Sequence, residues 1–535
     1  MRLRRRLGTL LLGGAVALPM WAAGLAPSVA QEPAPTTVVS SAYDIGTPVL
    51  RTIWVDPRKG RDGRSGATRS QAVRTLTAAW NRIPRGRALM RTGYRIMILP
   101  GTVTTSMSPN YWEDRHGTAR FPILVQSARG ASTVTLPSVN VYNTQYLYFV
   151  DLRFSSQDGD AIHCEKCDHF LVRNSVVRGM PPESGRIFDL LKINQSQHVY
   201  IEGNDISGAS NSSLDFVAVE HGSILANRVH DAQDWCAWVK GGSAYIKVDG
   251  NEFYDCGTGG FTAGQGTGFQ FMVAPWLMYE AYDVKITNNV AHDIEGAAFG
   301  VNGGYDVLIA YNTAYRVGGR DHLLEFVPGS RSCDGQPGDA DRKGCTANLA
   351  QGGWGTTRVS DGENYVRIPN RHVFVYDNLI VNPPGEQSQW QQLMVAPPYS
   401  GQWQDGSHVA VPTLFDQDLR IAGNVIWDGP AGHPSGLGRD DTGCAPDNPT
   451  CNEARYYADN AINSIEPQLV APRAGNFTVA PSSAAALSGR AVPVPDFGWS
   501  DCPGGAPTGS LSNAVPRDRA GAARSPGSLP GAYAS

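Results

Sequence analysis

The stretch Ile224-Leu225-Ala226-Asn227-Arg228-Val229 carries the pattern that decides the fold, and Val248-Asp249-Gly250-Asn251-Glu252-Phe253 repeats it 24 residues later. In both stretches, apolar residues alternate with other residues around a central Asn. The pattern recurs, with some slippage, around Asn174, Asn204, Asn289, Asn312, Asn378 and Asn424. From Asn174 onward the steps are 30, 23, 24, 38, 23, 66 and 46 residues, so the shortest steps define a repeat of about 23 residues.

A repeat of this length indicates a solenoid, in which each unit must stack on its neighbours to bury its apolar face. The alternation has a period of two, so the units are strands rather than helices. One turn accommodates three short strands, with successive turns about 4.8 Å apart. The Asn residues are expected to lie above one another in a bend, where Asn tolerates the left-handed region and its amides can form a ladder. The longer steps predict loops inserted on one face, while a β-propeller or β-sandwich with coincidental spacing is the alternative.

Composition agrees with a long, turn-rich β protein. The 535 residues are too many for one compact core, and 60 of them are Gly, about 11% against a usual 7% or so. The charged fraction is 18%, below the usual 25% or so. The net charge of -4 argues against a general nucleic-acid binder.

The N-terminal region reads as an export signal followed by a linker. Basic residues precede an apolar run from Leu10 to Leu25, and small residues end near Ala30, so residues 1–30 are predicted to be cleaved. The mature protein is therefore expected to be secreted, extracellular or periplasmic, with no membrane anchor after cleavage. Residues 31–50 are rich in Pro, Thr and Ser and are expected to form the linker.

The remaining chain divides into three predicted parts. Residues 51–100 form an N-terminal segment, in which Val73, Leu76, Trp80 and Ile83 draw one apolar stripe on a capping helix beginning near Ser70. Residues 101–460 form the coils with inserted loops. Residues 461–535 form a closing segment and a tail, loosely ordered from about residue 503, because it is rich in Gly, Ala, Ser and Pro.

Nine cysteines suit an oxidising compartment. Two pairs close in sequence are expected to staple long loops, and a third pair is separated by about one repeat. An odd count leaves one thiol over. These residues are Cys333/Cys345, Cys444/Cys451, Cys236/Cys256 and the leftover Cys502. Cys164 and Cys167 have the spacing of a zinc knuckle, but no second such pair follows, so a zinc site is not expected.

Three segments resemble the secreted right-handed parallel β-helix proteins, the superfamily of pectate lyases and related polysaccharide enzymes. They are Trp54-Val55-Asp56-Pro57 with the glycines that follow, Ile96-Met97-Ile98-Leu99-Pro100-Gly101-Thr102, and Asn476-Phe477-Thr478-Val479 near the end. The resemblance covers nearly the whole mature chain. It implies an all-β, right-handed parallel β-helix that acts on an extracellular polysaccharide. The sequence lacks the Trp-Ile-Asp-His block of the main pectate lyases, and the sequence blocks of the polygalacturonases do not occur in it as a set. No catalytic residue of either family is therefore carried over.

Counting back ten to twelve positions from the Asn residues predicts a groove. The count reaches His163, Lys192, Lys240 and Asn302, and Gln265 lies in a comparable strand-end context. Asp215 and Glu220 compete for the place between the two lysines. The alternative for each of these residues is a solvated outer face.

Further side chains are candidates for binding substrate. Trp235 and Trp238 flank the Lys240 segment and offer stacking surfaces for sugar rings, although Trp also packs in cores. Arg186, Arg316 and Arg320 lie in nearby segments and are further candidates.

Five acidic residues suit a possible Ca²⁺ site, because this ion takes six to eight oxygen ligands. They are Asp158, Asp160, Asp189, Asp231 and Asp234. Asp is also an ordinary turn residue, and no contiguous calcium loop is present.

The groove best suits β-elimination on a uronic-acid polymer. This reaction needs the substrate carboxylate neutralised by Ca²⁺ or by Lys or Arg, and a base beside the adjacent carbon. Lys192 or Lys240 is expected to be the base, with the other binding the carboxylate, since a lysine beside a second cation has a depressed pKa. A glycoside hydrolase with a carboxylate pair from Asp215, Glu220, Asp231 and Asp234 is the second hypothesis. A non-catalytic, adhesin-like glycan binder is the third, and a monomer is expected.

Overall fold

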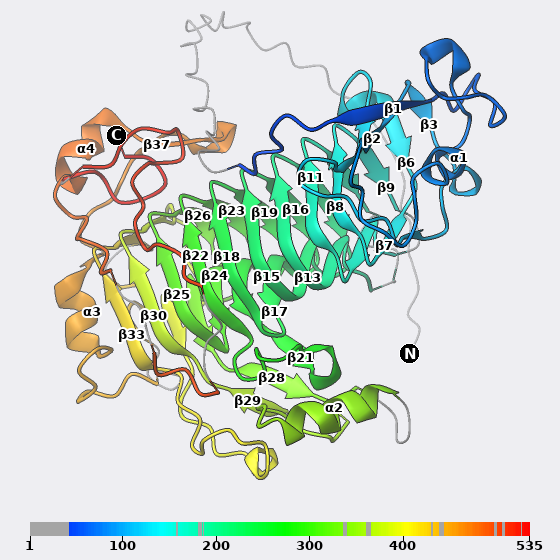
Figure 1. Ribbon diagram of the computed structural model, residues 1–535. Helices are drawn as coiled ribbons and strands as arrows, with labels where there is room; N and C mark the ends of the chain where they lie inside the picture. The colour runs from blue at the N-terminus through cyan, green and yellow to red at the C-terminus, as the bar shows by residue number, and fades with distance from the viewer. Residues whose placement is uncertain are drawn as a thin grey trace, which may run out of the picture.

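The computed structural model describes residues 42–534 except 157–158, 180–184, 186, 335–339, 360–364, 430–431, 438–442, 497–499, 505–508 and 526. The predicted signal segment lies outside the described residues. The described chain winds into a right-handed parallel β-helix, as predicted, with loops projecting from the coils (Figure 1). In the described part of the chain, no helix has the length and apolarity needed to cross a membrane.

Each coil presents three faces. Faces 1 and 2 are joined in one 20-stranded sheet, and face 3 is a separate 12-stranded sheet. The strands of face 1 are β4 (Trp112–Glu113), β7 (Val139–Tyr142), β10 (Ile162–Glu165), the first part of β13 (Leu191–Glu202), the first part of β15 (Leu214–Leu225), β17 (Trp235–Lys240), β20 (Gly259–Gly264), β24 (Ala297–Asn302), β27 (Leu324–Val327) and β32 (Leu393–Val395).

Face 2 follows face 1 in each coil and leads to the Asn bend. Its strands are β1 (Leu50–Val55), β2 (Gly93–Ile98), β5 (Ile123–Ser127), β8 (Gln145–Val150), β11 (Asp168–Arg173), the later parts of β13 and β15, β18 (Ser243–Asp249), β22 (Ala281–Thr287), β25 (Gly304–Ala310), β30 (Arg371–Tyr376) and β33 (Gln417–Ala422).

Face 3 follows the Asn bend. Its strands are β3 (Gly101–Thr102), β6 (Val134–Leu136), β9 (Arg153–Ser155), β12 (Val176–Arg178), β14 (Asp205–Ala209), β16 (Arg228–Ala232), β19 (Glu252–Cys256), β23 (Val290–Ile294), β26 (Thr313–Val317), β31 (Leu379–Val381), β34 (Val425–Trp427) and β35 (Ala461–Ile462). All pairings within faces 1, 2 and 3 between these strands are parallel, as a coil of constant hand requires.

Two small sheets and four α-helices complete the described structure. One sheet contains β21 (Gly266–Gly268), β28 (Gly329–Ser332) and β29 (Val366–Ile368), and the other β36 (Leu469–Ala471) and β37 (Asn476–Val479). The helices are α1 (Leu76–Trp80), α2 (Ala340–Ala350), α3 (Glu453–Asp459) and α4 (Pro481–Leu487).

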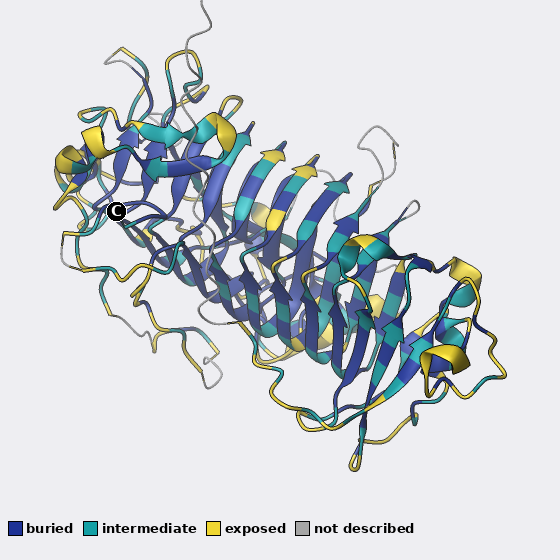
Figure 2. Cartoon of the chain, turned by 90° about the horizontal axis from the view of Figure 1, so that it is seen from above, coloured by how far each residue is buried: buried dark blue, intermediate teal, exposed yellow. Residues whose placement is uncertain are grey.

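Inward-pointing apolar side chains form one core along the axis of the coils. Alternate residues of each strand point inward, so Phe216, Ile246 and Phe253 are fully buried in the same cluster. Figure 2 shows the strands largely buried, with exposed residues gathered at edges, helices and loops. The outward-facing residues of the strands are therefore free to carry chemistry.

The predicted Asn ladder is confirmed and is fully hydrogen-bonded. The Nδ2 group of Asn227 donates to Oδ1 of Asn251 at 3.0 Å, and Asn251 donates likewise to Asn289 at 3.0 Å. Each Oδ1 also accepts the backbone N–H of the preceding rung, as from Asn227 to Asn251 at 2.9 Å. The ladder runs through Asn204, Asn227, Asn251, Asn289, Asn312, Asn378, Asn424 and Asn460.

Two details of the ladder prediction are wrong. The left-handed residue is not the ladder Asn but the one before it, such as Ala226 with φ 51° and Gly250 with φ 68°. Asn174 is such a left-handed residue, and Ser175 takes the rung beside Asn204. The bend needs positive φ one residue earlier because the Asn side chain must point inward to reach its neighbours.

The N-terminal helix is shorter than predicted. The stripe residues Val73, Leu76, Trp80 and Ile83 are buried, but α1 begins at Leu76, six residues later than expected, after its N-cap Thr75. The helix lies at the N-terminal end of the coils (Figure 1). Its function as a cap stays a prediction.

The described part of the C-terminal tail packs on the coils, so the prediction of loose order is wrong there. Arg519 Nη1 donates to Asn251 O at 2.7 Å, and Arg524 Cζ lies 3.9 Å from the ring centroid of Tyr311. The backbone N–H of Ala532 donates to Thr313 Oγ1 at 2.9 Å. Arginines that reach backbone carbonyls hold a Gly/Pro-rich segment that has little core of its own.

Four disulfides form among the described residues. They are Cys164–Cys167, Cys236–Cys256, Cys333–Cys345 and Cys444–Cys451, and Cys502 is a buried free thiol. The three expected pairs and the leftover thiol are confirmed. Cys164 and Cys167 bond to each other rather than to a metal.

Candidate functional site

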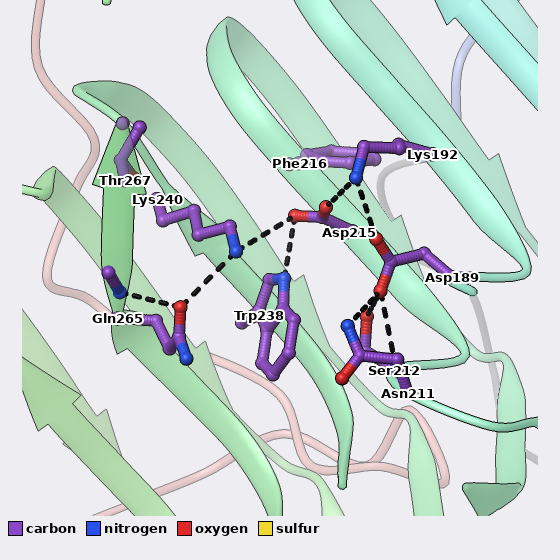
Figure 3. Close-up of polar contacts among 12 residues, drawn as sticks. Asp189, Lys192, Asn211, Ser212, Asp215, Phe216, Trp238, Lys240, Gln265 and Thr267 are labelled. Atoms are coloured by element: carbon purple, nitrogen blue, oxygen red, sulfur yellow. Dashed lines mark hydrogen bonds and ion pairs between the residues drawn. The ribbon is translucent and has the colours of Figure 1, made fainter. Parts of the chain in front are cut away.

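A row of outward-facing residues crosses face 1 from coil to coil. The strand register aligns His163 with Lys192, Lys192 with Asp215, and Asp215 with Trp238. Because adjacent parallel strands lie about 4.8 Å apart, each side chain in this row can reach its neighbours. The row is the candidate functional site, and Figure 3 shows Lys192, Asp215 and Trp238 of this row with their neighbours.

Asp215 lies at the centre of the site and has no exposed side-chain surface. Its Oδ2 atom is 3.1 Å from Lys192 Nζ, and its Oδ1 atom is 4.0 Å from Lys240 Nζ. Trp238 Nε1 donates to Asp215 Oδ1 at 2.6 Å. One buried carboxylate therefore lies between two lysines that approach it from different coils (Figure 3).

A second carboxylate fixes the first lysine. Lys192 Nζ donates to Asp189 Oδ2 at 2.7 Å, and Asp189 Oδ1 accepts hydrogen bonds from the side chains of Asn211 and Ser212, both at 2.8 Å. Asp189 lies just before β13, where the chain turns from face 3 to face 1. Lys192 is thus clamped between two carboxylates, with 30% of its side chain exposed.

The electrostatics of this clamp keep Lys192 charged. Burial alone would lower the pKa of Lys192, but Asp215 and Asp189 outweigh burial and raise that pKa above its ordinary value. Burial alone would raise the pKa of Asp189, but Lys192 outweighs it and lowers that pKa to about 2. Burial raises the pKa of Asp215, against the opposing charge of Lys240. The expectation of a depressed lysine pKa is wrong for Lys192, because carboxylates rather than cations surround it.

Lys240 has a different environment. Its Nζ atom lies 4.0 Å from Asp215 Oδ1 and donates a hydrogen bond to the neutral Gln265 Oε1 at 3.2 Å. Its Nζ lies 4.4 Å from the centroid of the Trp238 ring. Only 13% of its side chain is exposed, so it points along the floor of the site.

A cavity of about 230 Å³ opens over these residues. It is lined by Lys192, Asn194, Asp215, Val217, Lys240, Gly266, Thr267, Gly268, Phe271 and Asp334. A second cavity of about 460 Å³ lies toward the N-terminus on the same face, where Asn140 and His163 belong to β7 and β10. The two cavities lie over successive coils of face 1, and together they are the part of the protein to which the predicted groove corresponds.

His163 lines the larger cavity as a neutral side chain. Burial lowers the pKa of His163, and Lys192 adds to that effect while Glu165 opposes it. Its Nδ1 lies 3.1 Å from Asn140 Oδ1, and its Nε2 lies 3.2 Å from Asn194 Nδ2. This pair of partners assigns the proton to Nδ1 and a lone pair to Nε2.

The predicted row is only partly correct in register. His163 and Lys192 align, but Lys240 aligns with Val217, two residues further along the strand. Asn302 pairs with Gly264, which continues the line of Lys240 on the next coil. Gln265 belongs to the site because its side-chain oxygen accepts a hydrogen bond from Lys240. Of the two competing acids, Asp215 belongs to the row, whereas Glu220 lies beyond the bend at Ala218 on face 2.

The two tryptophans are not exposed stacking platforms, which corrects that prediction. Trp235 is 3% exposed and Trp238 is 1% exposed. Trp235 fits against Gly259 and Gly300 on the next two coils, where a Cβ atom would come within 2.4 and 2.8 Å of its ring. Both side chains therefore support the floor of the site instead of offering a face to a sugar.

The predicted arginines do not join the groove. Arg316 is on face 3, where it pairs with Asp293 at 2.9 Å. Arg320 follows the same strand and pairs with Glu295 at 2.5 Å. Arg186 lies outside the described residues. The two described arginines were misplaced because short sequence distance does not keep residues on one face of a coil.

The predicted calcium ligands do not come together among the described residues. Asp189 is already engaged by Lys192, Asn211 and Ser212, so a cation there would compete with an ammonium group. Asp231 is exposed on face 3, where it pairs with His230 at 2.7 Å. Asp234 lies in the turn between β16 and β17, and Asp158 lies outside the described residues. This donor set does not fit a calcium ion as an enclosed site.

Asp160 is the one described residue of the predicted calcium set, apart from Asp189, that lies beside the groove. It lines the larger cavity with His163. Burial raises the pKa of Asp160 to about 7, a shift that Lys192 opposes and that the negative charge of Asp189 reinforces. The carboxyl group is therefore partly protonated near neutral pH and makes a weak ligand for a hard cation.

Sequence reasoning missed Glu325 and Asn194. Glu325 extends the same row beyond Trp238 through Thr262 and Gly300, and Asn302 Nδ2 donates to its Oε1 at 3.1 Å. Burial raises the pKa of Glu325 to about 7, and the charge of Asp321 adds to the effect. Asn194 could have been found from the alternation of the strand, because it lies two residues after Lys192 and therefore points to the same side. Glu325 could not, because it lies in the 66-residue step between Asn312 and Asn378, where the repeat is interrupted.

Comparison with known proteins agrees with the fold. The family model described as the right-handed β-helix region matches residues 137–321, about a third of the chain. No curated protein matches the sequence. The family match and the strand pairing both show a right-handed parallel β-helix fold.

Solved structures with a similar arrangement of strands belong to proteins with different activities. A rhamnogalacturonan lyase shares 13% identity at a TM-score of 0.41, covering 70% of this chain and 87% of its own. The A-module of a mannuronan C-5 epimerase from Azotobacter vinelandii shares 12% identity at 0.40, covering 65% and 90%. The pectate lyase Pel9A shares 13% identity at 0.37, covering 91% and 97%. Such distant similarity carries no assignment of function.

Proposed function

We propose that this right-handed parallel β-helix protein is a secreted polysaccharide lyase that cleaves a uronate-containing polymer by β-elimination. The observation that carries the proposal is the pair of lysines on the groove floor, held by the buried Asp215 beside a cavity of about 230 Å³. An acidic polymer needs positively charged side chains to meet its carboxylates, and Lys192 and Lys240 line this cavity. The four disulfides fit an oxidising, extracytoplasmic compartment.

Lys192 is assigned to the substrate carboxylate. Asp189 and Asp215 raise its pKa, so it stays an ammonium group under working conditions and cannot accept a proton. A uronate carboxylate bound there loses part of its charge, which makes the proton on the adjacent carbon more acidic. Lysine thus supplies the neutralising charge that a calcium ion would otherwise provide.

Lys240 is assigned as the base. It lines the same cavity but lacks the two close carboxylates that hold Lys192 in its charged form. In the proposed step, the Lys240 amine takes the proton from C5, the C5–H electrons form the C4=C5 double bond, and the C4–O4 bond breaks. The proton carried by Lys240 can then pass to the leaving oxygen, so the step needs no other reactant.

The neighbouring His163 is assigned to substrate positioning. Its neutral ring lies one coil from Lys192 and lines the larger cavity, where it can hydrogen-bond a sugar hydroxyl. The Nε2 lone pair, which accepts from Asn194 Nδ2 at 3.2 Å, would also make the imidazole a competent base if a substrate displaced that contact. The experiment therefore includes His163 as the alternative base.

The test uses purified mature protein on a panel of uronate polymers, with a neutral glucan beside them. β-Elimination creates an unsaturated uronate, seen as new ultraviolet absorbance. Lys240→Ala is expected to lower kcat by at least about 100-fold, the usual contribution of a general base. Lys192→Ala is expected to raise KM and lower kcat, and Lys247→Ala on face 2 is the matched control expected to retain activity.

Each result has a distinct meaning. Reducing ends without new absorbance on every uronate polymer would replace the lyase with a hydrolase, and tight binding without either product would support the adhesin-like alternative. A loss of kcat in His163→Ala with full kcat in Lys240→Ala would move the base to His163. Full activity in both lysine variants would refute the assignment.

A further inference from the structure

Two histidines and one aspartate converge outside the groove, near the bend between faces 1 and 2. Asp168 and His169 begin β11, and His198 is in β13 on the next coil. Asp168 Oδ1 accepts hydrogen bonds from Nδ1 of His169 at 2.8 Å and from Nδ1 of His198 at 2.9 Å. In the ranges that the structure describes, this is the one group of three His, Cys, Asp or Glu residues whose ligand atoms all lie within 4.8 Å.

A column of stacked rings fixes the two imidazoles. The His169 ring lies 4.1 Å from the Tyr146 ring and 4.3 Å from the His198 ring, measured between centroids. His221 continues the stack at 5.4 Å from His198. All four residues have φ between 51° and 55°, so the repeated bend places one ring per coil in this column. The repeat therefore brings the two Nδ1 atoms to the same side.

We propose that Asp168, His169 and His198 bind one divalent late-transition-metal ion, of the class of Zn²⁺, Ni²⁺ and Cu²⁺, through one carboxylate oxygen and two imidazole nitrogens. Two nitrogens and one oxygen are the donors that these ions prefer, whereas Ca²⁺ and Mg²⁺ prefer oxygen alone. The site is independent of the groove and of its proposed reaction.

The distances suit a metal with open positions. For bonds of about 2.1 Å, the N···O separations of 2.8 and 2.9 Å correspond to N–metal–O angles of about 85°, close to those of adjacent octahedral ligands. The rings need to turn about their Cβ–Cγ bonds until each lone pair points at the ion. The exposed fractions of the side chains are 20% for His169, 24% for Asp168 and 35% for His198, so water molecules can complete the coordination shell of the metal.

The protonation states also suit a metal. Burial alone would raise the pKa of Asp168, but the hydrogen bonds from His169 and His198 outweigh burial and keep that pKa well below its usual range. The ionised carboxylate is the form that binds a metal ion. When a neutral imidazole binds metal through Nδ1, its proton moves to Nε2, so no proton is released to solvent from the neutral form.

The expected consequence is a cross-link between successive coils. Asp168 and His169 come from one coil and His198 from the next, so the ion joins two units that otherwise share strand pairing and packing. A ligand that binds the folded chain alone raises its stability. At a hundredfold excess over its dissociation constant, the metal is expected to raise the unfolding midpoint by about 2–3 °C.

The experiment uses the mature chain without a histidine tag, stripped with a chelator and titrated separately with Zn²⁺, Ni²⁺ and Cu²⁺. His169→Phe and His198→Phe retain a ring in the stack but remove the nitrogen ligand. His221→Phe is the matched control, because it alters the same column without removing a ligand. Calorimetry gives stoichiometry and affinity, and the Cu²⁺ resonance spectrum reports coordinated nitrogen.

One ion per chain is expected for the unmodified protein and for His221→Phe, with nitrogen coupling in the Cu²⁺ spectrum. His169→Phe and His198→Phe are each expected to lose at least about tenfold in metal affinity. Replacing a residue that only hydrogen-bonds to a metal ligand already lowers affinity by about that factor, and these two variants remove a ligand itself. Circular dichroism confirms that each variant is folded. The proposal is overturned if none of the three ions binds stoichiometrically, or if His221→Phe loses as much affinity as His198→Phe.

Discussion

Replacing Asn251 by Ala is expected to destabilise the coils strongly, because this residue has no exposed surface and sits in the middle of the ladder. Its Oδ1 accepts the backbone N–H of Asn227 at 2.9 Å and the Asn227 side-chain amide at 3.0 Å. Its Nδ2 donates to Ile224 O at 2.7 Å and to Asn289 Oδ1 at 3.0 Å. Alanine removes all four bonds and leaves space that the neighbouring rungs cannot fill.

The magnitude follows from the groups left without partners. Two buried donors of Asn227 lose their acceptor, and each unsatisfied buried group costs about 1–3 kcal/mol, so the loss is about 4 kcal/mol. Unfolding entropy is about 2.1 cal/mol/K per residue, which for roughly 500 ordered residues predicts a fall in the melting midpoint of about 4 °C. A smaller cooperative unit gives a larger shift, since coils contact only their neighbours.

The assay is urea and thermal unfolding followed by circular dichroism, with Asn110→Ala as the matched control. Asn110 is exposed and outside the ladder, so its replacement is expected to change stability by less than about 0.5 kcal/mol. A loss below about 1 kcal/mol for Asn251→Ala would refute the reasoning, because the amide ladder would then be dispensable for coil stacking.

Three further predictions concern the row on face 1 and the tail. The pKa of Glu325 is raised to about 7 from an ordinary 4.5, so its contribution to stability is present below pH 4.5 and is lost as the pH rises through 7. Glu325→Gln is therefore expected to gain at most about 3 kcal/mol over the unmodified chain at pH 8 and little at pH 4, measured by urea unfolding; an equal gain at both pH values would contradict this sign. Trp238→Phe removes the donor to Asp215 and is expected to cost about 1.5–3 kcal/mol, against less than about 0.5 kcal/mol for the exposed Trp390→Phe. Arg524→Ala removes the contact with Tyr311 and the bond to Asn288 Oδ1 at 2.8 Å, so faster thermolysin cleavage within residues 509–534 is expected, and unchanged cleavage would mean that other contacts hold the tail.

The coil could be predicted from sequence because its determinant is local and repeated. Asn227 and Asn251 each need only the residues one coil away, and a spacing of 24 residues is visible in the chain. The left-handed residue before each Asn was harder to predict, since Ala226 and Tyr311 occupy it as well as Gly250. Positive φ there is imposed by the inward direction of the Asn, not by the residue type that precedes it.

The site was predicted less well because it depends on the partners of each residue across coils. Counting from the ladder placed Lys192 correctly but missed Lys240 by two residues, since strand and bend lengths differ between coils. The effect of Asp189 on Lys192 depends on the turn before β13, which holds Asp189, and on Asn211 and Ser212 before β15, which orient its carboxylate. Trp235 was read as exposed because the glycines that make room for its ring lie one and two coils further along the chain.

The position of the groove follows from where the repeat is interrupted. The step from Asn251 to Asn289 is 38 residues against the basic 23, and its extra residues include β21 and Phe271, which wall the cavity over Lys240. The next long step, from Asn312 to Asn378, supplies β28, which pairs with β21, and α2, whose Asn348 donates to Phe269 O at 2.6 Å. The buried ion pair of Arg331 with Glu280 ties the two insertions together, and Glu280 Oε2 accepts from Thr267 Oγ1 at 2.6 Å. The regular coils therefore supply a rigid row of side chains, while the two insertions supply the wall that turns part of this row into a binding site.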